Sequence, residues 1–160
     1  MDDELRGVKG WLLTFVIIMA VISPLYGTFQ VYQSLYSGPI TAVGDNPLVA
    51  SLRTFEWLLL GVSALLCWFV AYRLLAVFNW LSVQIAIAVI WIAGLGGSIA
   101  EYVGVSMISG IDVGDIIAEA GPRGIIQPII FGVIWTSYLL KSERVANTYR
   151  DPGEQAEVFE

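Results

Sequence analysis

The sequence predicts an all-α fold: an integral membrane four-helix bundle with both termini on the cytoplasmic side. Hydrophobic residues make up 57% of the 160-residue chain, and its mean hydropathy is +0.74. Soluble domains contain only about 45–50% apolar residues. Charged residues make up 14% of the chain and avoid four apolar segments. Each segment approaches the roughly 20 residues that cross about 30 Å of hydrocarbon.

The first membrane helix is expected over residues 11–33. Its apolar run begins at Trp11, and Pro24 is expected to bend or weaken it because proline donates no backbone hydrogen bond. Acidic residues precede Arg6 and Lys9, and no small-x-small cleavage site follows the apolar run. These features favour a retained helix over a cleaved signal peptide.

The second and third helices are expected over residues 54–76 and 79–102. The loop before them, "YSGPITAVGDNPL", contains Gly-Pro and Asn-Pro, which are typical of turns. Only "VFNW" separates the two helices, and Asn79 is a good N-cap residue. So short a link predicts an antiparallel hairpin.

The segment "GVSMISGIDVGDIIAEAGPRG" is too polar to span a membrane. Asp112, Asp115 and Glu119 are spaced i, i+3 and i+7 and oppose an isoleucine-rich face, so we expect a short helix lying flat in the membrane interface. Three carboxylates could bind a divalent cation, but a solvated face is the favoured interpretation because the ligand set of a calcium site is absent.

The fourth helix is expected over residues 123–143, after the Gly-Pro break. The four-span membrane domain then covers residues 1–150, and residues 151–160 form a short acidic tail that we expect to be disordered.

The distribution of lysine and arginine predicts the orientation. Arg53 and Arg123 lie on one predicted side, and six basic residues lie on the other, cytoplasmic side: Arg6, Lys9, Arg73, Lys141, Arg144 and Arg150. Trp11, Trp80 and Trp135 lie toward the cytoplasmic ends of their helices, where we expect them to anchor at the interface.

Polar side chains are concentrated at the predicted outer ends of all four helices. Ionisable groups at membrane depth usually pair or face a cavity. We therefore hypothesise an outward-facing polar pocket in which Arg123 neutralises Glu56 or Glu101. The alternative is that these side chains extend individually to interfacial water. The predicted pocket residues are Gln30, Glu56, Glu101, Arg123 and Gln127, with Gln33 beside them.

Small residues recur at helical spacing in the third helix, at Ala93, Gly97, Ala100 and Gly104. Small residues let helices approach closely in lipid. They are expected to form a helix-packing face, either inside this bundle or against the helix of a partner subunit.

The fourth helix ends in "KSERVANTY", which contains Lys141, Ser142, Arg144, Val145 and Thr148. Lys141 and Arg144 lie one turn apart and could bind lipid phosphates while stabilising the helix C-terminus. The motif is interpreted either as a stop at the headgroups or as a cytoplasmic docking face.

Several function classes have little support. The chain has no histidine and one cysteine, Cys67, which excludes the usual zinc, haem and Cys-His sites. The pI of about 4.5 and the absence of a basic stripe argue against nucleic-acid binding. No nucleophile elbow or phosphate loop is present, so no catalytic residue, metal site or cofactor is predicted.

The chain resembles a bacterial family of small four-span membrane proteins, domain-of-unknown-function family 2569. The resemblance lies in the opening "GVKGWLLTFVIIMAVISPL" and in a C-terminal pattern made by Trp135, Tyr138, Ser142, Arg144, Val145, Thr148 and Tyr149. It implies a four-span fold in the bacterial cytoplasmic (inner) membrane and no particular activity.

The sequence favours a non-enzymatic role as an accessory or scaffold subunit of a membrane complex, or as a homo-oligomer. The alternative is a small carrier or sensor that uses the outer pocket. The expected partners are membrane lipids and either other membrane subunits or a second copy of the chain.

Overall fold

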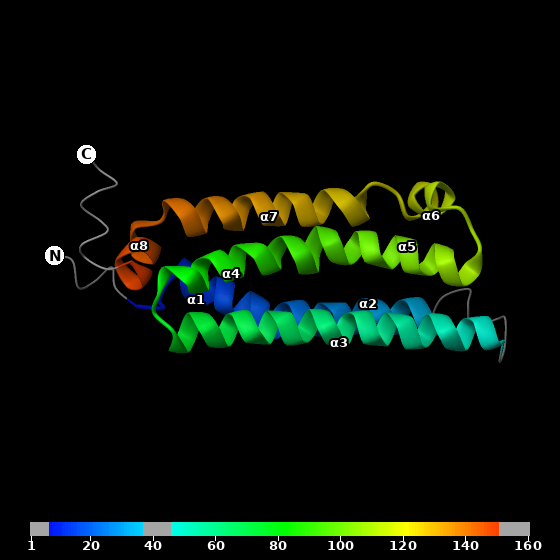
Figure 1. Cartoon of the computed structure of the whole chain (residues 1–160), viewed down its shortest axis with the longest axis horizontal. Helices are drawn as coiled ribbons and strands as arrows, with labels where there is room; N and C mark the ends of the chain where they lie inside the picture. The colour runs from blue at the N-terminus through cyan, green and yellow to red at the C-terminus, as the bar shows by residue number, and fades with distance from the viewer. Residues whose placement is uncertain (1–6, 37–45, 151–160) are drawn as a thin grey trace.

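The computed structural model describes residues 7–36 and 46–150, and every regular element in this part of the chain is helical. Four helices are long and apolar enough to cross a membrane, so the chain is a multi-pass membrane protein. Figure 1 shows them side by side in an elongated bundle, with α6 at one end and α8 at the other. The elements are α1 (Trp11–Ile17), η2 (Ile18–Ile22), α2 (Ser23–Tyr36), α3 (Pro47–Ala76), α4 (Trp80–Trp91), η4 (Ile92–Gly96), α5 (Gly97–Ser109), α6 (Val113–Ala120), α7 (Arg123–Lys141) and α8 (Glu143–Tyr149).

The helix ends differ from the predicted bounds. Helix α3 begins at Pro47, earlier than residue 54, because the Asn46 side chain accepts a 3.0 Å hydrogen bond from the Leu48 N–H and proline suits the first helical position. The third span continues to Ser109 instead of 102 and stops at Gly110, whose φ of +74° gives the left-handed C-terminal cap. The acidic tail predicted over residues 151–160 lies outside the described residues.

The predicted α3–α4 hairpin is confirmed. Asn79 caps α4 by accepting a hydrogen bond from the Ser82 N–H at 3.0 Å, and the Ser82 hydroxyl donates to the Val77 carbonyl at 2.8 Å. The two helices run antiparallel along the bundle (Figure 1).

The predicted weak point at Pro24 takes the form of a π-helical turn, η2, and the helix continues through it. The Ser23 N–H donates to the Ile18 carbonyl five residues back. A proline deprives the carbonyl four residues earlier of its donor. Here that carbonyl belongs to Ala20, and it accepts a 2.9 Å hydrogen bond from the Trp68 indole of α3.

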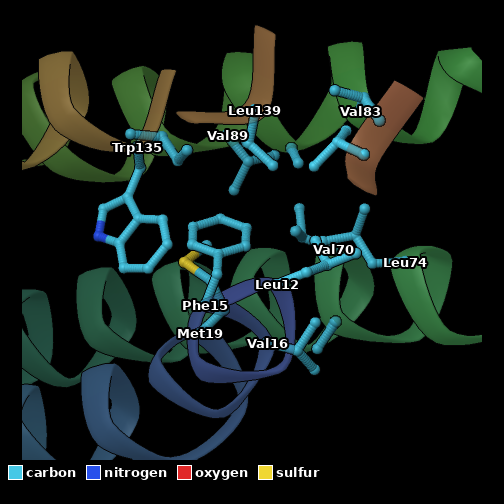
Figure 2. Close-up of a cluster of buried hydrophobic side chains, with 14 of the residues drawn as sticks. Leu12, Phe15, Val16, Met19, Val70, Leu74, Val83, Val89, Trp135 and Leu139 are labelled. Carbon is cyan, nitrogen blue, oxygen red and sulfur yellow. The ribbon is translucent and has the colours of Figure 1, made fainter. Parts of the chain in front are cut away.

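The packed core occupies the half of the bundle nearest α8. In this core Phe15 of α1 packs against Trp135 of α7, with ring centroids 4.8 Å apart (Figure 2). Leu74 and Leu139 close the core toward α8. The predicted interface position of Trp135 is therefore wrong: its ring is buried, because Phe15 and Phe131 provide an apolar and aromatic surface for it.

We expect Trp68→Phe to lower the free energy of unfolding by about 1–2 kcal/mol, because the Ala20 carbonyl then loses its donor in a medium without water. Thermal unfolding in detergent would measure the change. Trp57→Phe is the matched control, since Trp57 lies on the same helix and makes no hydrogen bond within the described part of the chain. Equal midpoints for the two variants would contradict the proposed role of the indole.

Candidate ligand cavity

A cavity of about 890 Å³ occupies the half of the bundle nearest α6. All four spans contribute to its wall. Its floor is formed by residues that also belong to the packed core: Met19, Cys67, Val89 and Ile90. The cavity therefore ends where the core begins. Outside the cavity, the half nearest α6 also buries Leu35, Val49 and Leu52.

The five predicted pocket residues, Gln30, Glu56, Glu101, Arg123 and Gln127, all line this cavity. Gln33 does not belong to its lining. Gln30 comes from α2, Glu56 from α3, Glu101 from α5, and the last two from α7. The structure thus brings together polar groups that are far apart in the sequence: Gln30 and Gln127 are 97 positions apart (127 − 30).

The two carboxyl groups are not neutralised by the predicted contact with Arg123. Among the described residues, no ion pair joins Arg123 to Glu56 or Glu101. The two glutamates line the same cavity from α3 and α5. Glu56 is half-buried and Glu101 is exposed. The cavity therefore presents two neighbouring carboxyl groups and a separate guanidinium group, each without a partner in the described chain.

Sequence reasoning missed the hydroxyl groups of the cavity. Ser34, Ser63 and Ser98 line it together with Tyr102. The helical spacing carried the missing signal. Ser34 follows Gln30 by four residues, Ser63 follows Glu56 by seven, and Ser98 precedes Glu101 by three, so each serine shares a helix face with a predicted pocket residue.

Two π-helical turns lie in the helices that form the cavity wall. Residues of η2 and of η4 line it, and such turns are frequent at functional sites. In η4, the position where a Cβ would stand on Gly94 lies 3.5 Å from the Pro128 Cβ of α7. At the α6 end, the Tyr102 hydroxyl lies directly against Gly124, so a side chain there would collide with the ring.

The predicted small-residue face does not act as one surface. Ala93 and Gly97 line the cavity, and Ala100 is exposed. Gly104 lies against the Phe55 ring of α3, where a Cβ would overlap it. Of these four residues, only Gly104 therefore permits a close helix contact inside this bundle.

The C-terminal motif folds back onto the bundle. Ser142 ends α7, and α8 then turns Val145 and Tyr149 into the core. Thr148 accepts a 3.0 Å hydrogen bond from the Gly7 N–H, and Arg150 stacks 3.9 Å from the Trp80 ring. Lys141 is exposed, while Arg144 is partly buried with one guanidinium nitrogen enclosed and unbonded.

The Tyr149 hydroxyl donates a 2.5 Å hydrogen bond to the Leu74 carbonyl in the last turn of α3. Carbonyls in a last helical turn lack an intrahelical donor. Burial raises the pKa of Tyr149 above its ordinary value. Its stabilising contribution is therefore complete below the ordinary tyrosine pKa and declines only as the pH rises beyond that value.

The acidic surface helix is present as α6, and Asp112 caps it by accepting a 2.8 Å hydrogen bond from the Gly114 N–H. Asp115 and Glu119 are exposed. Within residues 7–36 and 46–150, no three His, Cys, Asp or Glu side chains come together as a metal site would require.

A family model with the description "Protein of unknown function (DUF2569)" matches residues 5–150. No curated protein and no solved structure matches the chain.

We expect Gly104→Ala to destabilise the bundle by about 1–3 kcal/mol, because the added methyl group would force the Phe55 ring out of its place. Gly97→Ala is the control, since no atom lies within 4 Å of its added Cβ. Thermal unfolding of the two variants would measure the difference, and a Gly97→Ala loss as large as that of Gly104→Ala would contradict the assignment.

Tyr149→Phe is expected to cost about 1–2 kcal/mol of unfolding free energy, because it leaves the Leu74 carbonyl without its donor. Tyr72→Phe is the control and should change stability little, because Tyr72 is exposed on α3, the helix that contains Leu74. Chemical denaturation in mixed micelles, followed by tryptophan fluorescence, would compare them. An unchanged midpoint for Tyr149→Phe would show that this bond contributes nothing.

Proposed function

The chain belongs to the DUF2569 family, and we propose that it is a membrane-embedded ligand-binding protein that acts as a small carrier or sensor. The family is described only as of unknown function, so the proposal rests on the geometry of the cavity. One observation carries this proposal. All four spans direct polar groups into one cavity of about 890 Å³ whose floor is closed by the core. Ligand sites typically enclose about 300–1,000 Å³ and combine apolar walls with a few convergent polar groups.

The alternative that these polar side chains simply reach interfacial water explains the data less well. Long side chains at a helix end usually extend outward individually. In this protein Glu56 is half-buried, and Glu56 and Glu101 line the same cavity from different helices. Ionisable groups held in this way in a membrane protein usually serve a substrate or ion site.

A role as an accessory or scaffold subunit, or as a homo-oligomer, is the second candidate. Gly96 and Ala100 are both exposed on the outside of the third span, four residues apart. That spacing of small residues suits contact with another membrane helix. The two candidates are compatible, since a subunit can also bind a ligand.

We expect the 17.5 kDa chain, extracted from native membranes in a mild detergent, to carry a non-covalent ligand of defined mass in native mass spectrometry. Gly97→Trp should reduce the bound fraction several-fold because it fills the cavity, where Gly97 has open space. Gly61→Trp is the matched control, since Gly61 is exposed and lies outside the lining.

Equal ligand occupancy in the two variants, or no ligand in the wild type, would contradict the binding proposal. Co-migration with a second protein in fixed stoichiometry would support the subunit role, and Ala100→Leu should then weaken that association.

A further inference from the structure

The cavity continues into an apolar groove on α7. A second hollow, of about 390 Å³, runs along this helix past Ile126, Ile130 and Ile134. Arg123, Gln127 and Phe131 line both hollows. The polar space and the apolar groove are therefore adjacent, with Arg123 at the end nearest α6.

The wall between α2 and α7 is open. Helix α2 packs on α3, and α7 packs on α4, η4 and α5, whereas α2 and α7 make no extended contact in the described part of the chain. Both helices nevertheless line the cavity. The isoleucines of the groove are about half exposed, between 49% and 58%. In a bilayer this side faces acyl chains, so a ligand can enter laterally from the membrane.

The charges of the cavity call for a ligand that carries both signs. Glu56 and Glu101 line the same cavity without a cationic partner in the described chain, and Arg123 lines it without an anionic partner there. A cationic group beside the glutamates favours their charged form. An anionic group is favoured beside Arg123, which is the first residue of α7, where the helix dipole adds positive potential. Gln30 and Gln127 offer further hydrogen bonds.

We propose that the ligand is one phospholipid that bears a primary amine, an inference that rests on the proposed binding function. Its ammonium lies between Glu56 and Glu101, its phosphate lies at Arg123, and one acyl chain follows the isoleucine groove of α7. A primary ammonium donates three hydrogen bonds to carboxylate oxygens, whereas a trimethylammonium donates none. An anionic lipid matches Arg123 but brings no cation to the glutamates.

The test uses native mass spectrometry of the purified full-length chain with equal amounts of phosphatidylethanolamine, phosphatidylcholine and phosphatidylglycerol of identical acyl chains. The wild type should bind one phosphatidylethanolamine with a preference of roughly tenfold over the other two, as expected for charge-assisted hydrogen bonds. The double variant Glu56→Gln with Glu101→Gln should lose this preference. Its control, Asp115→Asn with Glu119→Gln, changes the net charge equally on the exposed face of α6 and should keep it.

Arg123→Gln should weaken all three lipids, because each carries a phosphate, whereas Lys141→Gln, at the opposite end of α7, should not. Thermal unfolding identifies any variant that fails to fold, and Glu101→Gln alone then replaces the double variant. Retained preference after the glutamate substitutions overturns the lipid assignment. A soluble solute found in the wild-type cavity, removed by Gly97→Trp, also overturns it but leaves the proposed binding function intact. Lipid adducts that are unaffected by Gly97→Trp overturn both.

Discussion

Every backbone carbonyl released inside a bilayer needs a donor from the chain itself, because hydrocarbon offers none. The bundle meets this requirement with side chains from neighbouring helices. Trp68 of α3 donates to the Ala20 carbonyl that Pro24 leaves free, which ties the first span to the second at the level of η2. Tyr149 of α8 donates to the Leu74 carbonyl at the end of α3. The irregular first span and the fold-back of the C-terminal segment both depend on these bonds.

The two ends of the bundle differ in how their interior is packed. At the α8 end, Tyr149 and Val145 complete a core to which α1 contributes Phe15 and α7 contributes Trp135 and Leu139 (Figure 2). From η4 onward, the third span lines the cavity with small residues, including Gly94, Gly97 and Ser98. A π-helical turn inserts one residue and so rotates the following helix face. The two turns therefore mark the level at which close packing gives way to the cavity.

The sequence predicted the membrane spans, the α3–α4 hairpin and the convergence of five polar residues, because length, capping and polarity at the helix ends are local properties. It did not predict α8 or the burial of Trp135. An aromatic residue near a helix end satisfies either an interface or a core, and only Phe15, 120 positions away (135 − 15), decides between them. The serines of the cavity could have been predicted from their helical spacing to Gln30, Glu56 and Glu101. The separation of Arg123 from the glutamates could not, because it depends on how α7 packs.

That separation is the strongest physical argument for a ligand. An ionised side chain at membrane depth costs about 2.5–3.5 kcal/mol even by insertion measurements. Glu56 and Glu101 lie within the second and third spans, and a protein that only needed a stable bundle would lower this cost by pairing them with a cation or by replacing them with apolar residues. Here the charges face one cavity without contacting one another. The proposed ligand carries both signs and would give each of these charges a partner in the cavity.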